Sequence, residues 1–248
     1  MNGATPAPLL RRQSLFVVGG GGLIAGNAIA ARAKKPGIEI VGVECALYPS
    51  MWNAIRGGNR PCGGATLAEG IAVNNVGALT LPIVRELVSD IVLVEEVLIE
   101  RAVNAFLTLQ KTIAEGAGAA GLAAMLAAPE RFAGRKVGLI VCGGNIDPRI
   151  LASIMVRELE REDRIVSFRL TIPDRPGVLG QIASRLGELG ANILGVEHHR
   201  LFLDVPAKGA KLDVTMETRD GAHAEEIFRA LAADGYHPVR MEGGAALE

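Results

Sequence analysis

The first 160 residues alternate short apolar runs with longer amphipathic or alanine-rich segments. The short runs predict buried strands at 15–18, 38–43, 90–94 and 136–141, and the longer segments predict helices at 23–34, 81–88, 95–112, 116–128 and 148–160. Apolar strands that are separated by helices indicate a mostly parallel sheet with helices on both faces. Residues 1–14 are expected to form an irregular lead-in, and the glycines and proline within 50–65 predict a loop-rich region.

A different order of elements follows the charged stretch at residues 157–164. Strands are expected at 165–172, 192–203, 211–217 and 236–241, and helices at 178–189 and 222–233. The order strand, helix, strand, strand, helix, strand is that of a ferredoxin-like βαββαβ domain. The pattern therefore predicts an α/β chain of two domains, 1–161 and 165–241, followed by a disordered tail at 242–248.

Composition narrows the classes of partner and compartment. The 248 residues are 49% hydrophobic, and a net charge of −1 with only 4% aromatic residues gives no case for binding nucleic acid or an anionic membrane. No apolar run reaches the 18 residues of a membrane helix. Three cysteines without metal-like spacing suggest a reducing cytoplasm. Arg11 and Arg12 precede an apolar stretch as in a twin-arginine export signal, but the same stretch equally forms the first strand, loop and helix of an α/β unit, which we favour.

Four consecutive glycines, Gly19 to Gly22, connect the first predicted strand to the first predicted helix. Without Cβ atoms the loop backbone can approach a ligand closely, and the positive end of the following helix favours an anion. This combination predicts a phosphate site. Two alternatives remain open: a tight turn without a ligand, and a dinucleotide site, because Gly20-x-Gly22-x-x-Ala25 fits the relaxed Rossmann fingerprint with Glu44 in the place of the ribose-binding acid.

Several motifs together resemble a known family. The loop Gly19-Gly20-Gly21-Gly22-Leu23 resembles the tetraglycine phosphate loop of fold-type II pyridoxal-phosphate enzymes, specifically threonine and serine dehydratases. Segments 66–73, 115–120 and 142–147 agree with that family in order and spacing, and segment 173–179 resembles the ACT regulatory domain. The chain is similar to the C-terminal part of a threonine ammonia-lyase: an incomplete fold-type II large domain and an ACT domain.

The resemblance implies a cofactor and the residues that hold it. Pyridoxal 5'-phosphate would be bound through its phosphate by the backbone amides of the glycine loop. Cys142 would face the pyridine nitrogen, where many relatives have serine, and Asn145 would brace the turn after it. Backbone near the ring face would come from Gly70. The implied cofactor-binding residues are Gly19, Gly20, Gly21, Gly22, Leu23, Gly70, Cys142 and Asn145.

The implied activity is β-elimination and deamination of L-threonine, with L-serine as a second substrate, to 2-oxobutanoate or pyruvate and ammonia. The family's Schiff-base lysine lies in a Ser-Phe-Lys segment before the glycine loop. All six lysines of this chain follow the loop and lack that context; they are Lys34, Lys35, Lys111, Lys136, Lys208 and Lys211. We therefore expect an N-terminally truncated form with no catalytic lysine, which is inactive by itself.

Metal and effector sites are implied less directly. Some relatives bind a divalent ion through a glutamate that matches Glu44 and an aspartate six positions later, where this chain has Ser50. We expect no metal site, with a cation at Glu44 as the alternative. In ACT domains a small amino acid binds near the first strand–helix turn at an interface between copies, which implies a homo-oligomer and the effector residues Asp174, Pro176, Gly177 and Asn192. A module that only drives dimerisation is the other interpretation.

Overall fold

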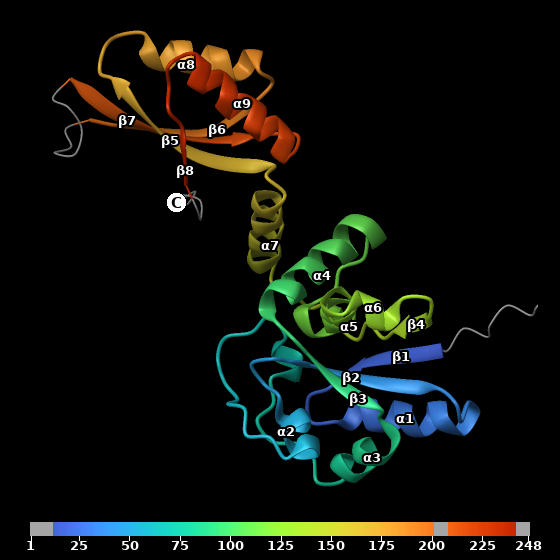
Figure 1. Cartoon of the computed structure of the whole chain (residues 1–248). Coiled ribbons are helices and arrows are strands. Elements are labelled where there is room, and N and C mark those ends of the chain that lie inside the picture. The colour runs from blue at the N-terminus through green and yellow to red at the C-terminus, as the bar shows by residue number, and fades with distance from the viewer. Residues whose placement is uncertain (1–11, 201–207, 242–248) are drawn as a thin grey trace, which may run out of the picture. The chain divides into compact units, whose positions relative to one another are not determined.

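The computed structural model describes residues 12–200 and 208–241, and the chain divides into two compact units, Met1–Ile154 and Met155–Glu248 (Figure 1). The expected lead-in up to residue 11, the end of the strand predicted at 192–203 and the expected tail at 242–248 lie outside the described residues. Each unit is described below by itself.

A four-stranded parallel sheet forms the centre of the first unit. Its order is β3-β2-β1-β4, with β1 (Arg12–Val17), β2 (Glu39–Cys45), β3 (Asp90–Val94) and β4 (Lys136–Leu139). The helices are α1 (Gly22–Lys34), α2 (Ser50–Arg56), the 3₁₀ helix η1 (Glu69–Ile71), α3 (Thr80–Leu87), α4 (Glu96–Gln110), α5 (Gly116–Ala127) and α6 (Pro129–Phe132). The chain passes from the first unit into the second within α7 (Pro148–Arg161). The predicted parallel α/β architecture is confirmed.

Helices cover the two faces of this sheet, with α5 and α6 on one side and α1 and α3 on the other (Figure 1). Successive side chains of β1 point to opposite faces. Leu15 and Val17 therefore join the core beneath α5, whereas Phe16 and Val18 join the core beneath α1 and α3. The alanines and glycines of α5 are almost all buried, because small side chains let this helix lie close to the sheet.

Two expectations for this unit were wrong. The region 50–65 begins with the helix α2, and the loop that was expected over the whole region is confined to residues 57–65. The first strand begins at Arg12, earlier than the irregular lead-in 1–14 allowed, because Arg12 and Gln13 pair with β4 and Gln13 also pairs with Glu39 of β2. Polar residues at the start of a central strand give no hydrophobic signal, so only the pairing shows their place.

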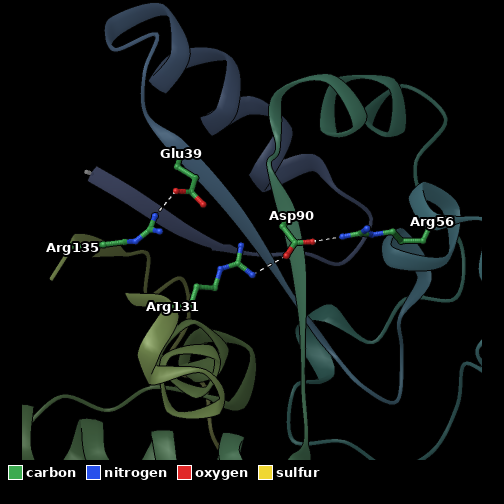
Figure 2. Close-up of polar contacts among 5 residues, drawn as sticks. All are labelled: Glu39, Arg56, Asp90, Arg131 and Arg135. Atoms are coloured by element: carbon green, nitrogen blue, oxygen red, sulfur yellow. Dashed lines mark hydrogen bonds and ion pairs between the residues drawn. The ribbon is translucent and has the colours of Figure 1, made fainter. Parts of the chain in front are cut away.

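Ion pairs hold the elements together where the strands begin (Figure 2). The Asp90 carboxylate accepts hydrogen bonds from Arg131 at 2.8 Å and from Arg56 at 2.7 Å, and Glu39 pairs with Arg135 at 2.7 Å. Burial disfavours the charged Asp90, but the two guanidinium hydrogen bonds outweigh it and lower the pKa of this carboxyl. The network ties α2 and α6 to the sheet edge opposite the glycine loop.

The second unit is a ferredoxin-like sandwich, as predicted. Its elements are β5 (Ile165–Pro173), α8 (Val178–Glu188), β6 (Asn192–His199), β7 (Gly209–Glu217), α9 (Gly221–Ala233) and β8 (Val239–Arg240). The sheet has the order β6-β7-β5-β8 with antiparallel pairs, and α8 and α9 cover one face (Figure 1). Alternate residues of β5 and β7, such as Phe168 and Leu212, fill the core beneath these helices.

No helix in the described ranges is long and apolar enough to cross a membrane.

Candidate functional site at the carboxyl edge of the parallel sheet

The glycine loop starts directly after β1 and ends as the N-terminus of α1. Gly21 is the residue before the helix and has a φ of 91°, a left-handed conformation that favours glycine. A Cβ on Gly21 would also lie 2.6 Å from both Met51 Cε and Thr80 Oγ1. The fold itself therefore requires glycine at this position.

Gly20 and Gly22 differ from Gly21, because in the described ranges a Cβ built on either residue would meet no atom within 4 Å apart from the adjacent residues and the backbone of α1. Packing within the chain thus does not explain why these positions lack side chains, whereas close approach of a ligand to the backbone does. In the same part of the structure, the start of α1 has neither a side-chain cap nor an acidic residue in its first turn. The free positive end of the helix and the bare backbone fit a phosphate group.

The loop is held in place by α3 on one side. The Thr80 hydroxyl donates a hydrogen bond to the Gly20 carbonyl oxygen at 2.6 Å, and the Gly77 N–H donates to the same oxygen at 3.1 Å. These bonds turn the carbonyl of Gly20 toward α3. Thr80 lies 60 positions after Gly20, so no local signal in the sequence could have assigned this role.

A second glycine turn follows β4 and meets the start of α5. The Glu115 N–H donates to the Gly143 carbonyl oxygen at 3.1 Å, and a Cβ on Gly143 would lie 2.3 Å from Glu115 Oε1. Likewise, a Cβ on Gly118 would lie 2.5 Å from the Gly143 oxygen. The two segments are packed so closely that side chains are excluded at these glycines.

The residue Gly70 lies at the same edge of the sheet. A Cβ on Gly70 would be 3.2 Å from Ala117 Cβ and 3.4 Å from Glu115 Oε1, and a Cβ on Gly19 would be 3.2 Å from Ile71 Cα. The structure therefore brings together four segments that the sequence analysis singled out separately: the glycine loop, η1, the start of α5 and the turn after β4. Parallel sheets bind ligands at this carboxyl edge.

Cys142 and Asn145 flank the second glycine turn and are both exposed. Partial burial of the sulfur, with a further contribution from the negative charge of Glu115, raises the pKa of the Cys142 thiol. The thiol is therefore neutral near pH 7. The hydrogen bond that fixes the turn comes from Glu115, so Glu115 supplies the bracing that we had expected of Asn145.

Glu115 is the residue that the sequence analysis missed. The run Glu115-Gly116-Ala117-Gly118 had been interpreted only as the start of a small-residue helix. Its Oε1 lies 3.4 Å from where a Cβ of Gly70 would be and 2.3 Å from where a Cβ of Gly143 would be, between two of the converging segments. An acid directly before a helix made of glycine and alanine was a usable signal, because such a helix has no other polar side chain.

Glu44 is buried, with 1% of its surface exposed, and its side chain reaches the start of α2. Its two carboxylate oxygens accept the N–H groups of Met51 at 2.8 Å and Trp52 at 2.9 Å. Burial raises the pKa of Glu44 to about 7, although the two backbone hydrogen bonds act in the opposite direction. The carboxylate is thus engaged in capping a helix, which favours neither a ribose contact nor the alternative cation site at Glu44.

The proposed effector residues of the second unit do not form one cluster. Gly177 precedes α8 with a φ of 90°, and Asp174 pairs with Arg200 at 3.1 Å. The Asn192 amide donates to Glu217 at 2.8 Å. Because β5 and β6 both pair with β7, the register places Asn192 and the Asp174–Gly177 turn at opposite ends of the sheet. The expectation that both reach one ligand is wrong for a single copy of the chain.

Polar side chains on the open face of the second sheet also come together. Glu197, His199 and Asp213 have potential ligand atoms within 4.8 Å of one another. Arg169, however, donates two hydrogen bonds to Asp213 at 2.6 and 2.5 Å, and this bidentate pair lowers the pKa of Asp213. The negative charge of Asp213 is therefore already balanced by the Arg169 guanidinium.

Comparison with protein families agrees with the geometry. The model of the family "Pyridoxal-phosphate dependent enzyme" matches residues 14–143, just over half of the chain, and that of the ACT domain matches residues 166–235. The chain therefore belongs to the pyridoxal-phosphate dependent enzyme family and carries an ACT domain.

Within that family, the chain is similar to L-threonine ammonia-lyases. An L-threonine ammonia-lyase of Thermotoga maritima is 41% identical over 228 residues, and one of Geobacter sulfurreducens is 37% identical over 224 residues. These alignments cover 91% and 90% of this chain but 56% of each relative, so the chain spans little more than half their length.

Solved structures give the same result for the fold. The T.th. threonine deaminase superposes with a TM-score of 0.51 at 34% identity, over 54% of this chain and 44% of that one. Threonine deaminase isoform 2 of Solanum lycopersicum gives 0.54 at 30% identity, over 60% and 42%, and a maize serine racemase gives 0.52 at 32%, over 62% and 49%.

Proposed function

We propose that this chain forms the cofactor-binding part of an L-threonine ammonia-lyase, which deaminates L-threonine, and L-serine as a second substrate, to the corresponding 2-oxo acid and ammonia. The convergence of the glycine loop, Gly70, Glu115 and the turn after Cys142 supports this function most directly. The similarity to L-threonine ammonia-lyases supports the choice of reaction.

Each group of residues at the site has its own proposed role in binding the cofactor. The N–H groups of the Gly19–Leu23 loop and the start of α1 would bind the phosphate of pyridoxal phosphate. The neutral thiol of Cys142 would contact the ring nitrogen without holding a proton on it, and the Glu115 carboxylate would orient the turn that carries Cys142. Pyridoxal phosphate supplies the electron sink for cleavage at the substrate carbons, and the protein supplies binding and orientation.

This chain by itself is proposed to bind the cofactor without catalysing the reaction. Lys136 is the first residue of β4, at the sheet edge away from the glycine turns, and Lys111 donates to the Thr108 carbonyl oxygen at the end of α4. The remaining four lysines lie at the end of α1, beside it, or in the second unit. None of the six stands in the sequence context of the family's Schiff-base lysine.

A binding titration tests the first half of this proposal. Purified chain should bind pyridoxal phosphate, inorganic phosphate should compete, and NAD should not. An absence of pyridoxal phosphate binding, or competition by NAD alone, contradicts the proposed cofactor site. Formation of 2-oxobutanoate from threonine by the purified chain, faster than with free pyridoxal phosphate, contradicts the proposed lack of catalysis.

A second candidate function concerns the ACT domain. The left-handed Gly177 exposes the N-terminus of α8, where the carboxylate of an amino-acid effector is proposed to bind at an interface between copies. Calorimetric titration with isoleucine, valine, serine and threonine, combined with light scattering, tests this function. A dimer that gives no heat with any of the four supports a domain that only joins copies of the chain. We also propose that the chain forms a homo-oligomer and that it functions in the cytoplasm. Its three cysteines are all free thiols, as is usual in that reducing compartment.

A further inference from the structure

Glu44 connects the end of β2 to the first turn of α2. Its side chain is buried, and its two oxygens accept the N–H groups of Met51 and Trp52, which otherwise have no partner in the helix. A serine, threonine, aspartate or asparagine directly before a helix usually serves this end, but Pro49 offers no acceptor side chain here. The strand thus supplies the cap from outside the helix.

Met51 continues this connection to the glycine loop. It is fully buried in the core between the sheet and α1, together with Val18 and Ile24. Its Cε occupies the space beside Gly21, where a Cβ would lie 2.6 Å away. Thr80 Oγ1, from α3, would lie at the same distance from that Cβ. The left-handed turn of the loop is therefore enclosed between one side chain from α2 and one from α3.

We propose that Glu44 is a positioning residue, which fixes α2 so that Met51 holds the glycine loop in its anion-binding conformation. Glu44 acts through Met51 and does not touch the anion. The identity of the anion rests on the function proposed above, whereas the mechanical link between Glu44, Met51 and Gly21 does not.

The two hydrogen bonds explain why a carboxyl group is needed at this position. Two N–H donors require two acceptor oxygens on one side chain. Glutamine has nearly the same shape but places an amide NH₂ against one of the donors, so that one buried N–H loses its partner. Glu44→Gln therefore loosens the first turn of α2 while it leaves the packing volume unchanged.

Hydrogen exchange and cofactor binding together test the proposal. Exchange is followed by mass spectrometry on segments 19–26 and 50–56, and the affinity for pyridoxal phosphate by titration. Glu44→Gln should accelerate exchange in both segments and weaken binding by about fivefold, because the loop is no longer preorganised. The matched control is Glu39→Gln, which removes an ion-paired carboxylate from the other end of β2 and should change neither measurement.

Variants of Met51 keep the test independent of the Glu44 variant. Met51→Ala should accelerate exchange in segment 19–26 and weaken binding, whereas Met51→Leu, which conserves volume, should restore both. Accelerated exchange in 50–56 alone for Glu44→Gln, with unchanged exchange in 19–26 and unchanged affinity, overturns the proposal. If the wild-type chain does not bind pyridoxal phosphate at all, the proposed function fails, and exchange in 19–26 still decides the role of Glu44.

Discussion

The N–H of Glu115 donates a hydrogen bond to the carbonyl oxygen of Gly143 at 3.1 Å, and the Glu115 carboxylate occupies the space where a Gly143 side chain would lie. One residue thus fixes the turn after β4 through both its main chain and its side chain. The turn carries Cys142, so the position of the thiol at the proposed cofactor site depends on the start of α5.

Replacing Gly143 should therefore lower the affinity for pyridoxal phosphate by more free energy than it removes from the stability of the fold. In Gly143→Ala the Cβ would lie 2.3 Å from Glu115 Oε1, so either the Glu115 side chain beside the turn or the turn itself must move. We expect the Kd for pyridoxal phosphate to rise by about tenfold, which corresponds to about 1.4 kcal/mol. The control is Gly138→Ala in β4, whose Cβ would meet its nearest atom at 3.7 Å. Equal affinities for the two variants would contradict this role of the turn.

Two glycines at the start of α1 should respond to alanine in opposite directions. Gly21→Ala places a side chain at a φ of 91° and against Met51 and Thr80, which should lower the free energy of unfolding by about 1–3 kcal/mol. Gly26 is inside α1 with open space around its Cβ in the described ranges, so Gly26→Ala should raise it by about 0.5–1 kcal/mol. Urea denaturation measures both changes.

The raised pKa of Glu44 predicts a specific dependence of stability on pH. Its pKa is 4.5 in the unfolded chain and about 7 in the folded protein, so the folded state binds the proton more tightly. This contribution to stability is complete below pH 4.5 and is lost as the pH rises through 7; its size is about 3 kcal/mol. Unfolding measured from pH 4 to pH 8 should show this loss in the wild type. Glu44→Gln should lack it, whatever its absolute stability.

The Arg169–Asp213 pair predicts the opposite dependence in the second unit. The guanidinium lowers the pKa of Asp213, so this stabilisation is present at neutral pH and is lost as the pH falls through the folded-state pKa. Asp213→Asn should cost about 1–3 kcal/mol at pH 7, because Arg169 loses a charged, nearly buried partner. The exposed pair Arg164–Glu162 provides the control, since Glu162→Gln should cost less than about 0.5 kcal/mol.

Cys142 provides a chemical probe of the proposed site. Alkylation by iodoacetamide requires the thiolate, so the raised pKa of the Cys142 thiol predicts slow labelling at pH 7 that accelerates as the pH rises. Pyridoxal phosphate should protect Cys142 from this labelling. Equal labelling of Cys142 with and without pyridoxal phosphate would place the cofactor elsewhere.

The order and type of the elements could be predicted from the sequence because the signals are local. The β-branched, apolar run at 38–43 favours a strand and the alanine-rich segment at 116–128 favours a helix, and each became the expected element. Helix α2 was not predicted, because its first turn is capped by Glu44, a residue of the preceding strand, and not by a residue directly before the helix.

For the site, the sequence by itself determined the glycine loop, the second glycine turn and the family they belong to, since these depend on which residues lack a Cβ. Only the tertiary structure decided that Thr80 and Met51 enclose Gly21, that Glu115 fixes Gly143 and that Asn192 lies away from Gly177. These relationships join residues that are distant in the chain. They follow from strand register and helix packing, which no local pattern encodes.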